Sequence, residues 1–224
     1  PDFRVYTGSR HVNIDFYDQI PVMMFRKEPL EESLNRLSKK IFDIVFSLFI
    51  ILAVFTWLFP ILIILIKISS KGPAFFKQKR SGENNHPFTC FKFRTMCINK
   101  MSDELQATAN DPRITKLGAF MRKTNLDELP QFFNVLYGNM SVIGPRPHML
   151  AHTEQYSKLI DNYLIRHLSK PGISGWAQVK GYRGETKELI TMQKRVEFDI
   201  WYLENWSFLL DLKIIWMTIF NMIK

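Results

Sequence analysis

One apolar segment limits what this chain can fold into. Residues 44 to 66 read IVFSLFIILAVFTWLFPILIILI and contain no Asp, Glu, Lys or Arg, whereas lysines stand just before them (Lys39, Lys40) and just after them (Lys67, Lys71). At about 1.5 Å per residue, a helix of this length reaches across the roughly 30 Å hydrocarbon core of a bilayer. The sequence therefore predicts a long membrane helix.

Two residues disturb a simple membrane span. Asp43 lies at the start of the apolar run, and Pro60 falls inside it. Proline lacks a backbone N–H and its ring collides with the preceding turn, so we expect a kink at Pro60. The lysines at both ends give no charge asymmetry that would set an orientation. Composition alone favours a spanning helix, and it leaves open a re-entrant helix that returns to the same face and a helix buried in a soluble core.

The C-terminal residues 205 to 224 form a second apolar stretch. Asp211, Lys213 and Asn221 interrupt it, and Trp206 and Trp216 have the amphipathic rings that suit a headgroup boundary. This pattern predicts an interfacial helix rather than a second span. The alternative is a core helix under a soluble domain.

The net charge of +9 is concentrated in the middle of the chain. Residues 67 to 146 contain 13 Lys and Arg against 6 Asp and Glu. Such an excess predicts an anionic partner: nucleic acid, an anionic membrane surface or a phosphorylated substrate. The aromatic residues concentrate in the apolar segments and do not alternate with the basic ones, so no nucleic acid is expected. The sequence has neither a Gly-rich nucleotide loop nor a serine-hydrolase elbow, and Cys90 and Cys97 lack metal-ligand spacing.

Local patterns predict a small mixed domain between the two apolar segments. Turn signals at residues 72–73 and 81–87, with alternating residues between and after them, indicate a β-hairpin. Helical composition marks four further stretches: 116–123, 127–137, 149–168 and 187–204. Residues 1–30 resemble the tail of a preceding unit.

Two adjacent carboxylates, Asp127 and Glu128, lie in the segment NLDELP. Thr124 or Asn125 could cap a helix there, and either carboxylate would then complete a capping box. The same pair could serve catalysis, because a helix N-terminus and the nearby Arg122 both favour an ionised carboxylate. An ionised carboxylate can attack phosphorus, and adjacent ones can hold a divalent cation that bridges phosphate oxygens. The stretch alone favours the cap and leaves the catalytic interpretation open.

Several arginines lie where they could bind phosphate. Arg146 stands between two prolines in IGPRP, so its guanidinium has a fixed origin from which to clamp phosphate oxygens, although a solvated loop arginine is the alternative. Arg94 in KFRTM has the same two interpretations. Arg113 is expected to pair with Asp111 instead. Arg183 lies in KGYRGE between glycines, where a backbone can approach a ligand closely, and an ordinary exposed turn is equally consistent.

Four ordered motifs closely resemble the bacterial sugar transferases, the monotopic phosphoglycosyl transferases. They read KGPAFFKQKRSG, FKFRTM, DPRITKLGAFMRKTNLDELPQFFNVLYGNMSVIGPRP and KPGISGWAQVKGYRGET. GYRGET is most similar to the undecaprenyl-phosphate glucose phosphotransferases. The resemblance implies an α+β, mostly helical fold: a membrane-embedded re-entrant helix (36–70), a small cytoplasmic catalytic part with a β-hairpin (71–204) and an interfacial amphipathic helix (205–224). Residues 1–35 are then the end of a preceding N-terminal region and a linker.

The resemblance also implies an activity. Asp127 would attack the sugar-bearing phosphate of a UDP-sugar, and undecaprenyl phosphate would then take the phosphosugar from the carboxylate. Glu128 would assist, with Mg²⁺ held by the pair, while Arg122 and Arg146 match the family's phosphate-binding arginines. The expected location is the cytoplasmic face of the bacterial inner membrane, in contact with membrane lipids. A homodimer is kept as an alternative to a monomer.

For the membrane helix, the resemblance implies a re-entrant path, which reverses the compositional preference. Lys39 and Asp43 match the basic and acidic positions that open the family's helix. Lys40 replaces the family's usual arginine, and Phe59 stands where a serine usually precedes the proline. Two rival hypotheses are a non-catalytic protein that binds anionic lipid, and a metal-dependent phosphatase of lipid diphosphates.

Overall fold

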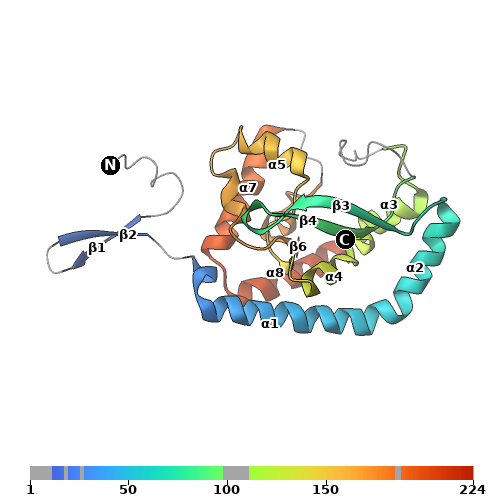
Figure 1. Cartoon of the computed structure of the whole chain (residues 1–224), viewed down its shortest axis with the longest axis horizontal. Helices are drawn as coiled ribbons and strands as arrows, with labels where there is room; N and C mark the ends of the chain where they lie inside the picture. The colour runs from blue at the N-terminus through green and yellow to red at the C-terminus, as the bar shows by residue number, and fades with distance from the viewer. Residues whose placement is uncertain (1–11, 18–19, 26–27, 98–110, 185–187, 224) are drawn as a thin grey trace.

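The computed structural model describes residues 12–17, 20–25, 28–97, 111–184 and 188–223, and the first 11 residues of the expected N-terminal region lie outside these ranges. A hairpin of β1 (Val12–Tyr17) and β2 (Ile20–Phe25) opens the described part. Helices then account for most of the body (Figure 1). They are α1 (Ser33–Ile50), α2 (Thr56–Ser69), α3 (Lys116–Lys123), α4 (Gln131–Leu136), α5 (Leu150–Ser157), α6 (Trp176–Val179), α7 (Leu189–Glu204) and α8 (Phe208–Ile223). The mostly helical fold is confirmed.

The apolar segment forms one bent helix from Ser33 to Ser69, and only 22% of its most apolar window is buried. A π-helical turn, Ile51–Phe55, separates α1 from α2, and the path changes direction around it (Figure 1). The sequence predicts the kink at Pro60, and the structure has the bend about one turn earlier. Pro60 lies inside α2, and because its ring presses on the turn before it, the irregular hydrogen bonding falls on the N-terminal side.

The polarity of α1 is opposite to that of a helix on a soluble domain. Lys39, Asp43 and Ser47 are buried at intervals of four residues, whereas the other side exposes Val45 and Phe49 at 61% and 63%. A helix that turns its polar stripe inward and its apolar side outward suits an apolar environment. This arrangement argues against the interpretation as a soluble core helix.

The first two residues of the buried polar stripe of α1 both have buried polar partners. Lys39 Nζ lies 2.7 Å from Asp211 Oδ2 and donates to the Tyr202 hydroxyl at 3.2 Å. Asp43 Oδ1 accepts from Ser141 Oγ at 3.0 Å and from the Val142 N–H at 2.9 Å. The membrane helix is thus fastened through these two residues to α7, α8 and the short strand β5 (Ser141–Ile143).

The predicted hairpin is confirmed: β3 (Phe75–Ser81) pairs antiparallel with β4 (Pro87–Phe93). Asn134 of α4 fastens the hairpin, since its side chain accepts from the Phe91 N–H and donates to the Thr89 carbonyl. A further small sheet, which the sequence did not reveal, pairs β5 in parallel with β6 (Gly172–Ser174).

Two of the four predicted helices are confirmed, as α3 and α7. The stretch 127–137 is instead divided into a 3₁₀ turn, η5 (Leu126–Glu128), and α4, with Pro130 between them. The stretch 149–168 is divided into α5, which ends at Ser157, and a 3₁₀ turn, η6 (Tyr163–His167), which follows Asn162 with its left-handed backbone (φ 67°).

The C-terminal helix α8 exposes large apolar side chains and buries a carboxylate. Its Leu209 and Trp216 are 75% and 70% exposed, whereas Asp211 and Ile214 are buried. Trp206 differs from the prediction: it is buried, and its Nε1 donates to Asp211 Oδ2 at 3.1 Å, so it belongs to the core rather than to a headgroup boundary.

Candidate active site

The acidic pair lies in a tight connection between α3 and α4. Thr115 caps α3 by accepting from the Gly118 N–H at 2.9 Å, and a side chain at Gly118 would stand 2.0 Å from the Thr95 carbonyl oxygen. This glycine therefore lets α3 pack directly on the chain that follows β4. At the other end of α3, Asn125 adopts φ 58° and reverses the chain into η5, which carries Asp127 and Glu128.

Glu128 is held between two cations. Arg146 donates to both its carboxylate oxygens, at 2.5 Å and 3.2 Å, and Lys92 Nζ donates to Oε1 at 2.8 Å. Burial raises the pKa of Glu128, but the fields of Arg146 and Lys92 outweigh burial and hold this pKa well below its usual value. The capping interpretation is wrong, because the carboxylate bonds to these side chains and η5 has no side-chain cap.

Asp127 has a different environment from its neighbour. Its side chain is 7% exposed, and within the described residues its carboxylate accepts no hydrogen bond. Burial raises the pKa of Asp127, and the negative charge of Glu128 raises it further, against the opposing pull of Lys92 and Arg122. Arg122 favours the ionised form of Asp127, as expected, but burial and the charge of Glu128 outweigh it. A buried carboxylate with a perturbed pKa and no hydrogen-bond donor on its oxygens is a candidate nucleophile.

Three of the four predicted arginines gather around the pair. Arg146 contacts Glu128 directly. Arg122 donates from Nε to Thr95 Oγ1 at 2.9 Å, and its charge acts on Asp127. Arg183 donates to the Arg122 carbonyl at 3.2 Å and to the Asn125 side chain. With Lys92, these arginines place four cationic side chains around two carboxylates, an excess that suits a diphosphate.

Arg94 does not join this group. Its guanidinium donates to the backbone carbonyls of Ser70 (2.7 Å) and Lys71 (2.9 Å), at the C-terminal end of α2. These contacts satisfy carbonyls that a helix end leaves without partners, so the structure gives Arg94 a structural role instead of the predicted phosphate contact. Arg113 pairs with Asp111 at 2.6 Å, as predicted.

Sequence reasoning missed Lys92. It lies 36 positions before Glu128, and strand alternation between Phe91 and Phe93 indicated only that it would face away from the core. The spacing of residues along the sequence did not show that this face of β4 lies next to the acidic pair.

Sequence reasoning also missed a buried polar cluster behind the site. Arg166 donates to the Arg146 carbonyl at 2.7 Å and lies 2.7 Å from Asp199 of α7. Arg195, also on α7, donates to the Gly184 carbonyl at 3.0 Å. The cluster thus holds the backbone of both loops that carry site arginines.

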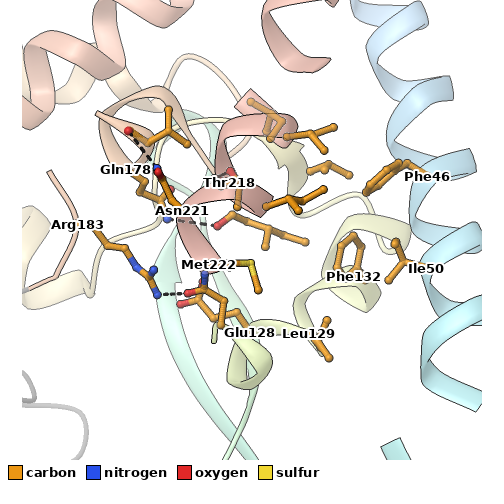
Figure 2. Close-up of a pocket in the computed structure, with 18 of the residues that line it drawn as sticks. Phe46, Ile50, Glu128, Leu129, Phe132, Gln178, Arg183, Thr218, Asn221 and Met222 are labelled. Atoms are coloured by element: carbon orange, nitrogen blue, oxygen red, sulfur yellow. Dashed lines mark hydrogen bonds between the residues drawn. The ribbon is translucent and has the colours of Figure 1, made fainter. Parts of the chain in front are cut away.

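An apolar cavity of about 280 Å³ opens beside the acidic pair. Glu128 and Arg183 lie at one end, and Phe46, Ile50 and Phe132 lie at the other (Figure 2). Helix α8 forms one wall, and β5 and β6 contribute to another. The site therefore combines a cluster of cationic side chains with an apolar cavity that reaches the bent helix.

The comparison with known proteins bears on this combination. A family model described as "Bacterial sugar transferase" matches residues 34–224. The chain belongs to this family. The resemblance that the sequence motifs indicated is thereby confirmed, and the match includes both carboxylates of the pair and every residue of the cavity wall.

Three relatives illustrate the range of this family. The UDP-glucose:undecaprenyl-phosphate glucose-1-phosphate transferase of Escherichia coli (strain K12) is 47% identical over 212 residues, which are 94% of this chain and 45% of that protein. An exopolysaccharide production protein, PSS, of Rhizobium leguminosarum bv. phaseoli is 42% identical over 186 residues, 81% of this chain and 92% of that protein. The UDP-N-acetylgalactosamine-undecaprenyl-phosphate N-acetylgalactosaminephosphotransferase of Aeromonas hydrophila is 44% identical over 158 residues, 70% of this chain and 37% of that protein. This chain thus spans less than half the length of the Escherichia coli relative.

Proposed function

We propose that this chain transfers a hexose 1-phosphate from a UDP-sugar to undecaprenyl phosphate, through a covalent phosphosugar on Asp127. The names of the relatives support the two substrates. The observation that carries the proposal is the contrast within the acidic pair: Glu128 is neutralised by Arg146 and Lys92, whereas the Asp127 carboxylate is buried, free of hydrogen bonds from the described residues and surrounded by cations.

The reaction has two displacements at phosphorus. In the first, an Asp127 oxygen attacks the sugar-bearing phosphorus, the bond from that phosphorus to the bridging oxygen breaks, and UMP leaves. In the second, a phosphate oxygen of the acceptor attacks the same phosphorus and the Asp127 carboxylate is regenerated. The product is undecaprenyl diphosphate sugar. Each displacement has a lower barrier than a direct transfer that requires both substrates to be aligned at once.

The cationic side chains stabilise the charge that develops on phosphate oxygens. Arg146 is fixed by its bidentate contact with Glu128 and by the Arg166 contact to its carbonyl, so its remaining donors face the site without further ordering. Arg122 and Arg183 add two further charges that act on the pair. Such preorganised donors act on the transition state without reorganisation during the reaction.

Mg²⁺ fits this site as a loosely held ion. Both oxygens of Glu128 already bond to cations, so Asp127 offers the open oxygen ligands, and no group of three acidic, His or Cys side chains gathers in the part of the chain that is described. Mg²⁺ is often held by one or two carboxylates together with water and substrate phosphates, and when bound it neutralises phosphate charge. We therefore assign it to Asp127, with Glu128 beside it.

We further propose that the bent helix is re-entrant, with the site at the cytoplasmic face of the bacterial inner membrane. The outward apolar side of α1 and the exposed apolar residues of α8 support membrane contact. A site at the interface lets a water-soluble UDP-sugar and a lipid phosphate reach the same carboxylate.

The first half-reaction tests this function directly. Protein in nanodiscs is incubated with Mg²⁺ and UDP-glucose without an acceptor, and intact mass spectrometry is used to detect an added hexose phosphate. We expect an adduct that maps to Asp127, is absent in Asp127→Asn and disappears when undecaprenyl phosphate is added. Asp161→Asn, at an exposed position, serves as the matched control. A folded wild-type chain that forms no adduct with UDP-glucose, UDP-galactose or their N-acetyl forms would overturn the proposal and favour a lipid-binding protein, whereas phosphate release without a nucleotide sugar would favour a phosphatase.

A further inference from the structure

The structure assigns the apolar cavity beside Glu128 to the isoprenoid chain of the acceptor, next to its phosphate. This inference rests on the proposed function, because it takes a polyprenyl phosphate as the second substrate. It adds a location that the family match and the relatives' names do not give: a chamber bounded by α1, α4, β5, β6 and α8 (Figure 2).

The polar end of the cavity suits a phosphate. Arg183 and Glu128 line it together with Asn125, and the charges of Arg183 and Arg146 act on the same region as Asp127. A phosphate held here by Arg183 would lie close to the carboxylate that carries the sugar phosphate. The chain attached to that phosphate would then extend into the cavity.

The walls of the cavity suit a hydrocarbon better than a sugar or a nucleotide. The hydroxyls of Ser174 and Thr218 are hydrogen-bonded to each other at 2.6 Å, and the Asn221 amide donates to the Val179 carbonyl at 3.4 Å. Gln178 keeps an unpartnered Oε1, but the rest of the wall consists of large apolar side chains. A nucleotide buried here would lose hydrogen bonds to water that this wall does not replace.

The apolar end of the cavity is continuous with the surfaces that face the membrane. Phe46 and Ile50 belong to the membrane helix, and Ile219 of α8 both lines the cavity and is 50% exposed. A volume of about 280 Å³ is near the lower limit of small-molecule pockets, roughly 300 Å³. The cavity therefore has room for the isoprene units nearest the phosphate, and the rest of the chain would pass out beside Ile219 into the bilayer.

Narrowing the cavity should separate the two half-reactions. We would replace Ile219 by Trp, a change at the partly exposed mouth that leaves the buried core alone. The matched control is Leu212→Trp, on the same helix and 41% exposed but outside the cavity wall. A second variant, Val54→Trp, narrows the cavity from the membrane helix, so that the result does not depend on α8 alone.

Two rates are measured for each variant in nanodiscs: formation of the Asp127 adduct from UDP-glucose, and its discharge after undecaprenyl phosphate is added. We expect Ile219→Trp and Val54→Trp to form the adduct but to discharge it at least tenfold more slowly, with a higher KM for the acceptor. Leu212→Trp should retain both rates.

Two outcomes would overturn the assignment. Unchanged discharge in both cavity variants would mean that the acceptor chain lies elsewhere and that the cavity takes another apolar group, such as a phospholipid acyl chain. Loss of adduct formation in the cavity variants but not in Leu212→Trp would assign the cavity to the nucleotide sugar. A wild-type chain that forms no adduct is a different result: it would contradict the proposed function itself, whatever the cavity holds.

Discussion

At the scale of single residues, the chemistry of the site depends on how differently two adjacent carboxylates are treated. Lys92 and Arg146 both donate hydrogen bonds to the Glu128 carboxylate, and neither donates one to Asp127. Had Arg146 paired with Asp127 instead, the proposed nucleophile would have been held in a tight ion pair and its basicity reduced. The fork of Arg146 therefore serves two purposes, since it fixes Glu128 and leaves Asp127 available.

Arg146→Lys tests this fork. Lysine retains the charge but cannot make two parallel hydrogen bonds to the Glu128 carboxylate, and it presents fewer donors to phosphate. We expect adduct formation to slow by about 100-fold, the lower end of the loss when one preorganised donor is removed, because lysine keeps the charge. Single-turnover mass spectrometry provides the rate, with Arg36→Lys on the exposed side of α1 as the control. A loss no larger than that of the control would show that charge alone matters at this position.

At the scale of elements, a buried ion pair joins α1 to α8 and fixes how the two helices are placed. Asp211 accepts from Lys39, Tyr202 and Trp206, so one carboxylate joins the membrane helix, α7 and α8. Such a buried ion pair adds little net stability by comparison with apolar packing, but it is costly to break from one side. Its main effect is to fix how the helices are placed.

Lys39→Met should therefore destabilise the fold more on its own than together with Asp211→Asn. The single change leaves Asp211 buried without its cation, at a cost of about 3 to 5 kcal/mol, whereas Lys39→Met with Asp211→Asn removes both charges and keeps one acceptor oxygen, with an amide NH2 that can donate to the Tyr202 hydroxyl. We expect the double variant to melt at a higher temperature than Lys39→Met in the same detergent. Lys40→Met, at the exposed neighbouring position, should melt like the wild type. Additive effects of the two changes would argue against a coupled pair.

Elements that depend on neighbouring residues could be predicted from the sequence, and contacts across the fold could not. Turn residues and alternation are enough for the hairpin of β3 and β4. In contrast, the presence of a charged Asp211 in an apolar stretch is explained only by its ion pair with Lys39, which lies 172 positions away. The same applies to Trp206, whose partner is Asp211. At the site, the motif led to Asp127 and Glu128, but the hydrogen-bond partners of Glu128 come from β4 and from the loop after β5, which no local pattern brings together.

At the scale of the whole molecule, both ends of the bent helix contact the same domain. Near its start, Lys39 pairs with Asp211, and at its end the Ser70 carbonyl accepts from Arg94. A straight helix of 37 residues would be about 55 Å long, so a helix that crossed the bilayer would carry these two contacts to opposite faces. The re-entrant path proposed above accounts for both contacts, because the helix then returns to the face from which it entered. In this proposal the π-helical turn before Pro60 provides the bend.

Labelling single cysteines from either side of the membrane tests the return path. In a Cys97→Ser background, where the remaining Cys90 is buried, Glu32→Cys and Lys71→Cys place thiols at exposed positions just beyond the two ends of the helix. We expect a membrane-impermeant maleimide to label both positions in inverted vesicles and neither in intact spheroplasts, because a re-entrant helix has both ends in the cytoplasm. Labelling of one position from each side would show a spanning helix. The Lys39–Asp211 and Arg94–Ser70 contacts could then not form in the same molecule, and the proposed placement of the active site at one face of the membrane would have to be abandoned.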